Sequence, residues 1–148
     1  MAMRDEGPDD ERRPRDEGQG APSRAAGAGP PEPTRFTMSV LDDACLLQIA
    51  GELDLSNAAE FEAQIGRAVE RRSIVAIDLR ACRYCDSAAL SVLVRTRKAL
   101  GNYLRVVIPE SGQVRRIFDL AQLTQALGTC TTLADALAGK ADGGSASA

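Results

Sequence analysis

The first 34 residues contain no Leu, Ile, Val, Phe or Tyr, and six of the chain's seven prolines lie among them. Such a segment cannot bury enough apolar surface to offset the entropy lost on folding, so we expect residues 1–34 to be a disordered tail. Residues 139–148, rich in Gly, Ala and Ser, are expected to form a second flexible tail. The sequence therefore predicts one folded domain over about residues 35–138.

The charge and the missing histidines exclude several kinds of function. The net charge of −3 arises within the predicted N-terminal tail, and the chain contains no His. Without His, neither a Ser-His-Asp triad, a Cys-His pair nor a histidine metal site can form. The neutral domain lacks the basic surface used to bind nucleic acid, and no apolar run reaches the roughly 18 residues that a membrane span needs. We expect a cytoplasmic protein that is not an enzyme and needs no cofactor or metal.

Short apolar runs alternate with helical patterns along the domain. The run from Ile74 to Leu79 is almost continuously apolar, which is typical of a central strand covered on both faces. We interpret Asp78, near its end, as a structural residue whose carboxylate reaches loop amides. The predicted strands span 36–40, 45–49, 74–79 and 104–108, with a short extended piece near 130–131. With helices after 57, at 87–100, from 112 and at 133–138, the pattern predicts an α/β fold whose mixed sheet of about five strands is packed by about four α-helices.

Capping residues precede the first predicted helix. Ser56 and Asn57 both favour the N-cap position, and Glu60 follows Asn57 at the spacing of a capping box. Apolar residues then repeat at helical spacing, which predicts one buried face made of Ala58, Phe61, Ile65, Ala68 and Val69.

The segment Asp86-Ser87-Ala88-Ala89-Leu90 opens the second predicted helix and has two interpretations. In the first, Asp86 and Ser87 are simply helix caps. In the second, Ser87 is a phosphorylation site, because a phosphate at a helix N-terminus would meet free backbone N–H groups and the positive end of the helix dipole. A phosphate would also add about −1.5 to −2 charges to a neutral domain.

Three motifs in this order resemble the STAS domain, the fold shared by sulphate-transporter cytoplasmic domains and bacterial anti-sigma-factor antagonists. They are Gly51-Glu52-Leu53-Asp54, Ile77-Asp78-Leu79 and the helix-opening segment that begins at Asp86. The resemblance covers about residues 36–138 and implies that Ser87 is phosphorylated by a cognate anti-sigma kinase. It also implies a partner-binding surface on the residues of the first and third motifs and their neighbours: Asp54, Ser56, Asp86, Ala88 and Ala89.

The sequence departs from the family pattern at two places. Ala89 stands where the family usually has Gly, and its extra methyl is expected to restrict how closely a partner backbone approaches. The residues Arg83 to Cys85 stand where the family commonly has apolar side chains. The first departure concerns the identity of the partner more than the fold.

The resemblance implies an anti-sigma factor antagonist. Its unphosphorylated form would bind an anti-sigma factor with serine kinase activity and free a sigma factor, phosphorylation at Ser87 would release it, and a phosphatase would reset it. An alternative on the same fold is a STAS subunit of a stress-signalling assembly or of a lipid-transport ATPase complex.

Four cysteines remain to be explained. Cys82 and Cys85 have C-x-x-C spacing, whereas Cys45 and Cys130 have no paired partner nearby, so a zinc site lacks its second pair of ligands. A thioredoxin-like redox pair opens a helix directly, but here a Ser-led cap follows the pair. We interpret the four as ordinary reduced thiols, with zinc binding and redox activity as the weaker alternatives.

Overall fold

The computed structural model describes residues 33–139. Within them, five strands form one mixed sheet. The strands are β1 (Arg35–Leu41), β2 (Ala44–Leu53), β3 (Ile74–Asp78), β4 (Cys82–Cys85) and β5 (Leu104–Val107). The helices are α1 (Ala58–Arg71), α2 (Ser87–Leu100), a short 3₁₀ turn η4 (Gly101–Tyr103), α3 (Gln113–Leu120), α4 (Leu123–Ala126) and α5 (Leu133–Ala138).

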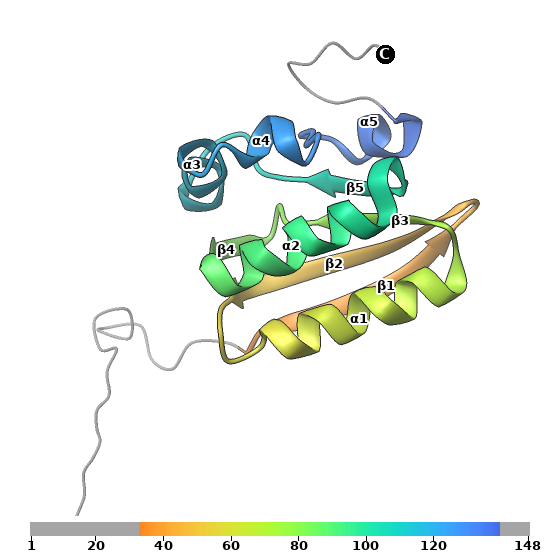
Figure 1. Cartoon of the computed structure of the whole chain (residues 1–148), viewed down its shortest axis with the longest axis horizontal. Coiled ribbons are helices and arrows are strands. Elements are labelled where there is room, and N and C mark those ends of the chain that lie inside the picture. Colours follow the sequence, from red (N-terminus) through yellow and green to blue (C-terminus); the bar gives the residue numbers. More distant parts are fainter. Residues whose placement is uncertain (1–32, 140–148) are drawn as a thin grey trace, which may run out of the picture. The chain divides into compact units, whose positions relative to one another are not determined.

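The long strand β2 organises the sheet. β1 pairs with it antiparallel as a hairpin, while β3 pairs parallel with its first half and β4 pairs parallel with its last three residues. β5 extends the sheet beyond β3, which gives the order β1-β2-β3-β5. Figure 1 shows α1 and α2 running side by side along the sheet, with the end of β2, β4 and the start of α2 at the same end of the domain.

Alternation along the strands builds the main core between the sheet and its helices. Cys45, Leu47 and Ile49 of β2 point to one face, where they join the buried side of α1. That side contains Phe61, which is fully buried and stacks on Phe36 with a centroid distance of 6.3 Å. The helical spacing therefore predicted the α1 face correctly, except that Val69 is 40% exposed.

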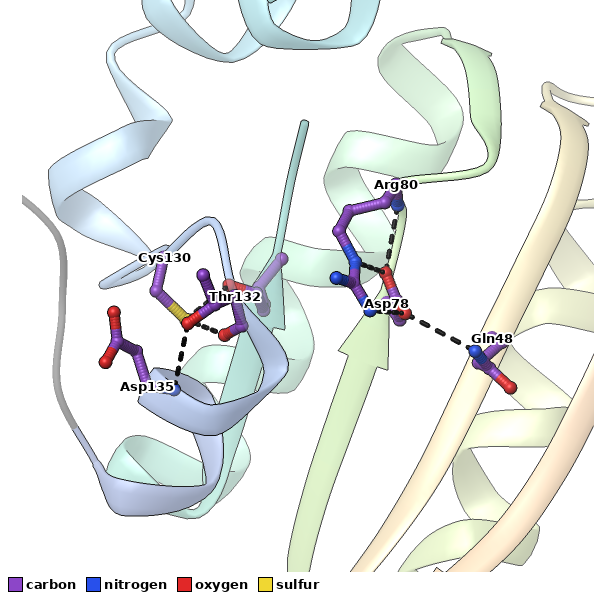
Figure 2. Close-up of polar contacts among 7 residues, drawn as sticks. Gln48, Asp78, Arg80, Cys130, Thr132 and Asp135 are labelled. Carbon is purple, nitrogen blue, oxygen red and sulfur yellow. Dashed lines mark hydrogen bonds and ion pairs between the residues drawn. The ribbon is translucent and has the colours of Figure 1, made fainter. Parts of the chain in front are cut away.

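The opposite face of the sheet carries a smaller cluster. Val107 of β5 packs there with Cys130 and with Ala136 of α5, and Leu133 lies against this cluster. Cys130 forms an isolated parallel bridge with Val107, and its sulfur lies 3.5 Å from the carbonyl oxygen of Thr132 (Figure 2). α5 thus covers the β5 end of the sheet on the face opposite α1 and α2.

The structure confirms the predicted α/β class and mixed sheet, but two strand assignments were wrong. Residues 82–85 form β4, although the sequence pattern assigned them to a loop, because Arg83 interrupts any apolar alternation. The extended piece near Cys130 is only a bridge and not a strand. β2 also continues to Leu53, beyond the predicted end at residue 49.

The two predicted tails lie almost wholly outside the described residues. Thr34, which the sequence analysis assigned to the N-terminal tail, is part of the domain: its hydroxyl donates to the carbonyl oxygen of Glu52 at 2.7 Å. Gly51, opposite this contact, has a φ of +116°, and a Cβ there would lie 2.9 Å from Cα of Thr34. Glycine is therefore required at this point of β2.

Asp78 is held at the end of β3 by a neighbouring arginine. Its Oδ1 accepts from the Arg80 backbone N–H and from Nε, both at 3.0 Å, and its Oδ2 accepts from Nη2 at 2.8 Å. Gln48 adds a long contact at 3.5 Å (Figure 2). Burial alone raises the pKa of Asp78, but the hydrogen bonds and charge of Arg80 outweigh it, so the net shift is downward. The bond to a loop amide confirms the structural role expected for Asp78.

We expect Asp78→Asn to lower the free energy of unfolding at neutral pH by about 1 kcal/mol, a value reduced because the Arg80 side chain is 43% exposed. Since the folded pKa lies below the unfolded value of about 4, the contribution of Asp78 is complete above about pH 5 and is lost as pH falls through the folded pKa. Denaturant unfolding between pH 7 and pH 3 measures this. A difference in the free energy of unfolding between the wild type and Asp78→Asn that stays constant from pH 7 to pH 3 would contradict this role of Arg80.

Candidate functional site

The candidate site lies where β4 leads into α2. The backbone N–H of Asp86 donates to the carbonyl oxygen of Leu53 at 3.0 Å, so the start of α2 is fixed against the end of β2. The loop from β2 to α1 begins at this same point. Residues from the first and third sequence motifs are therefore brought together at one end of the sheet (Figure 1).

The Asp86 carboxylate joins the helix to that loop. Its Oδ1 accepts from the backbone N–H groups of Ala88 at 2.9 Å and Ala89 at 3.2 Å, which confirms the predicted N-cap. Its Oδ2 accepts from the backbone N–H of Leu55 at 3.0 Å. One expectation is corrected here: the amides of Ala88 and Ala89 are not free to receive a phosphate, because Asp86 already occupies them.

Ser87 is the first residue of α2, and its side chain is exposed. Ala88 is half-buried. Ala89, in contrast, is fully buried in the main core. Its methyl group therefore faces the domain interior, which contradicts the expectation that it limits the approach of a partner, and we leave Ala89 out of the candidate surface.

Hydrogen bonds give the loop between β2 and α1 a defined shape. Asp54 Oδ1 accepts from the backbone N–H of Ser56 at 3.0 Å and from its hydroxyl at 2.5 Å. Asn57 occupies the N-cap position of α1, but its side chain does not cap the helix. It turns back instead, accepting from the Asp54 N–H at 2.9 Å and donating to the Glu52 carbonyl oxygen at 2.9 Å. The predicted capping box at Asn57 is therefore wrong, and this residue stabilises the loop.

Two carboxylates bind amides of the turn that follows β2, and one exposed apolar side chain lies on this turn. Asp86 and Asp54 accept from the successive amides of Leu55 and Ser56, so both acids border the same short turn. The Leu55 side chain is 78% exposed on that turn. The sequence analysis missed Leu55, because a single apolar residue in a polar loop is common and does not by itself indicate a contact surface.

The cysteines lie inside the domain. All four are buried, and the sulfurs of Cys82 and Cys85 are 3.8 Å apart. Over the part of the chain that the structure describes, no group of three or more His, Cys, Asp or Glu side chains is arranged to hold a metal ion. The same residues include no helix that is both long and apolar enough to cross a membrane.

Comparison with known proteins decides the family. The model of the STAS domain matches residues 35–136, which include every strand and all but the last residues of α5. The chain belongs to the STAS domain family. The resemblance seen in the three sequence motifs is thereby confirmed over nearly the whole described region.

Three proteins that resemble this STAS domain are named anti-sigma factor antagonists. It is 33% identical over 111 residues to the anti-sigma-F factor antagonist RsfB of Mycobacterium tuberculosis, covering 72% of this chain and 91% of the relative. An anti-sigma factor antagonist from Mycobacterium paratuberculosis superposes with a TM-score of 0.65 at 28% identity, covering 72% of this chain and 92% of that one. SpoIIAA in its unphosphorylated form shares the fold, with a TM-score of 0.56 at 17% identity, covering 70% and 93%.

Proposed function

We propose that this STAS domain is an anti-sigma factor antagonist whose binding state is set by phosphorylation of Ser87. The observation that carries the proposal is the exposed hydroxyl of Ser87 at the first position of α2, beside a helix cap that does not need it. Because Asp86 provides the cap, the Ser87 side chain can be modified without removing a hydrogen bond on which α2 depends. The names of the mycobacterial relatives support the same function.

The surroundings of Ser87 explain why a phosphate would act as a switch. The carboxylates of Asp86 and Asp54 border the same turn, and the helix amides of Ala88 and Ala89 are already bound. A phosphate of about −1.5 to −2 charges would therefore be neither neutralised nor enclosed by these groups. It would remain on the surface and add like charge and bulk where an anti-sigma factor docks, while the isolated domain keeps its fold.

The chemistry belongs to the partners. The serine kinase activity of the anti-sigma factor transfers the γ-phosphoryl group of ATP to the Ser87 hydroxyl oxygen, a base of the kinase takes the hydroxyl proton, and ADP leaves. A phosphatase hydrolyses the phosphoserine and restores the binding form. The chain itself supplies the hydroxyl and the docking surface around Asp54, Ser56, Asp86 and Ala88.

The experiment incubates the full chain with the cognate anti-sigma kinase and ATP and follows the intact mass. One phosphate is expected, and peptide fragmentation should assign it to Ser87. Ser87→Ala should take up none. Ser91→Ala is the matched control, because Ser91 is exposed on the same helix one turn later, and this variant should be phosphorylated like the wild type. Phosphate on Ser91, or on no residue of the wild type, refutes the proposal.

Leu55 is expected to contribute apolar contact to the docking surface. Because its side chain is 78% exposed, Leu55→Ala should leave the free energy of unfolding within about 0.5 kcal/mol of the wild type. It should weaken binding to the anti-sigma factor by roughly 1–2 kcal/mol, about tenfold. Calorimetric titration measures this. Leu120→Ala is a matched control, since Leu120 is 77% exposed at the end of α3, and a loss as large in that variant would contradict a specific role for Leu55.

A further inference from the structure

β4 carries two cysteine side chains on one side of the strand, although three positions separate them. In a regular strand, residues i and i+3 point to opposite faces. Here Cys82 lies opposite Gly51, whereas Tyr84 already lies opposite Glu52, so Arg83 is an extra residue in β4. This β-bulge reverses the alternation once and brings the sulfurs of Cys82 and Cys85 to 3.8 Å.

The surroundings of the two sulfurs distinguish them chemically. Cys82 is 4% exposed and Cys85 is 1% exposed. The hydrogen bond with Cys85 lowers the pKa of Cys82 more than burial raises it, and the carbonyl of Tyr84 lies 3.2 Å from the Cys82 sulfur. The same contact and burial raise the pKa of Cys85. The two pKa shifts have opposite directions, which favours Cys82 as the sulfur that reacts first.

We propose that Cys82 and Cys85 are a redox modification site that forms a reversible disulfide and thereby loosens the Asp86 contacts at the start of α2. The sequence analysis favoured ordinary thiols because the pair does not open a helix. The bulge at Arg83 is a separate feature, and it brings the two sulfurs together within a strand. The site is two residues away from Ser87 along the chain, but its formation does not depend on the proposed phosphorylation.

Hydrogen peroxide is a sufficient oxidant. The Cys82 thiolate attacks one peroxide oxygen and the O–O bond breaks, which leaves a sulfenic acid on Cys82 and a hydroxide that becomes water on protonation. The sulfur of Cys85 then attacks the Cys82 sulfur, an S–S bond forms, the S–O bond breaks, and a second water leaves with the Cys85 proton. Two electrons pass from the thiol pair to one peroxide. A small dithiol returns them and restores both thiols by exchange.

Forming the bond draws together two side chains of β4. A disulfide holds its sulfurs about 2.05 Å apart, so the two atoms must approach by roughly 1.7 Å from their separation of 3.8 Å. β4 is a four-residue strand that pairs with β2, and the residue after it is Asp86. Any shift of Cys85 acts directly on the bonds from Asp86 to Leu53, Leu55 and the first turn of α2.

Tryptic mapping tests the bond in the full chain. The protein is treated with peroxide, quenched in acid, alkylated in denaturant and digested with trypsin. Cleavage after Arg83 separates the two cysteines, so a Cys82–Cys85 disulfide leaves peptides 81–83 and 84–95 joined until a dithiol is added. We expect this joined pair and a loss of two alkylatable thiols. Full alkylation of all four cysteines, or a bond to Cys45 or Cys130, overturns the proposal.

Variants and hydrogen exchange complete the test. Cys82→Ala and Cys85→Ala should each abolish the bond, whereas Cys45→Ala, a buried cysteine outside β4, should retain it. In the oxidised wild type, the amides of Leu55, Ala88 and Ala89 should exchange about fivefold to tenfold faster, the factor that corresponds to a lost cap bond. Ile65 in α1 serves as the internal reference. A disulfide that leaves these three amides unchanged overturns the proposed effect on α2. No anti-sigma factor is needed, so this outcome is separate from the fate of the proposed function.

Discussion

Ser87→Glu is expected to lower the affinity for the anti-sigma factor by at least about 100-fold, whereas Ser87→Ala binds it as tightly as the unphosphorylated wild type. A change of about 3 kcal/mol in binding free energy corresponds to this factor. The Ser87 side chain is exposed at the first position of α2, so neither substitution disturbs the core. The Glu carboxylate, however, adds an acid directly after Asp86 in the chain, where the helix amides of Ala88 and Ala89 are already bound.

Calorimetric or surface-based titration of both variants against the cognate anti-sigma factor measures the effect. The anti-sigma factor is loaded with ADP, so that no phosphate is transferred during the titration. The Ala variant should also remain bound in the presence of ATP, because it has no hydroxyl to modify. Ser91→Glu is the charge-matched control, because it adds the same carboxylate at an exposed position one turn along α2. It should lower the affinity for the anti-sigma factor by less than about tenfold. Equal losses for the two Glu variants would mean that net charge, and not the position of Ser87, governs binding.

The salt dependence of the affinity lost in Ser87→Glu distinguishes charge repulsion from steric exclusion. Exposed charges are screened over about 8–10 Å at physiological ionic strength, so a loss caused by like charge should shrink as salt is added. A loss caused by steric exclusion should not change. The phosphorylated wild type, which carries more charge than Glu, should show the steeper dependence.

Sequence patterns predicted those parts of the domain that follow from periodic burial. The apolar alternation of β2 and β3 and the helical spacing in α1 placed most of the core, because burial imposes those periods directly. β4 was missed because its bulge at Arg83 breaks the alternation on which strand prediction relies. The side chain of Asn57 was misassigned for a related reason. It donates to the carbonyl oxygen of Glu52 and does not cap the helix, and this bond depends on where β2 ends, which the local sequence does not reveal.

The candidate site was predicted in part. Asp86 as a cap follows from local preference at a helix start, and the structure confirms it. Its second contact, to Leu55, spans 31 residues and depends on the sheet bringing the ends of β2 and β4 together. The burial of Ala89 likewise depends on how α2 is rotated against the core. Contacts between distant segments, and not the identity of the motifs, were therefore the missing information.

Asp86→Ala is expected to have the largest effect on stability among the surface positions of the site, lowering the free energy of unfolding by about 2 kcal/mol. It removes the acceptor of three backbone N–H groups, two in the first turn of α2 and one at Leu55. Denaturant unfolding followed by circular dichroism measures the change. A free energy of unfolding equal to that of the wild type would show that water replaces the carboxylate without cost.

Asp86→Asn divides this effect into its two parts. Asn is as good an N-cap as Asp, so its carbonyl oxygen should keep the bonds to Ala88 and Ala89 and recover most of the stability. Its amide nitrogen cannot accept from Leu55, so the tie to the loop is lost. We therefore expect nearly normal unfolding but faster hydrogen exchange at the Leu55 amide. Binding to the anti-sigma factor should weaken because the Leu55 backbone, and with it the exposed side chain, is no longer tied to the start of α2. If the Asn variant binds as well as the wild type, the loop needs no fixed position for docking, and Leu55 contributes contact area alone.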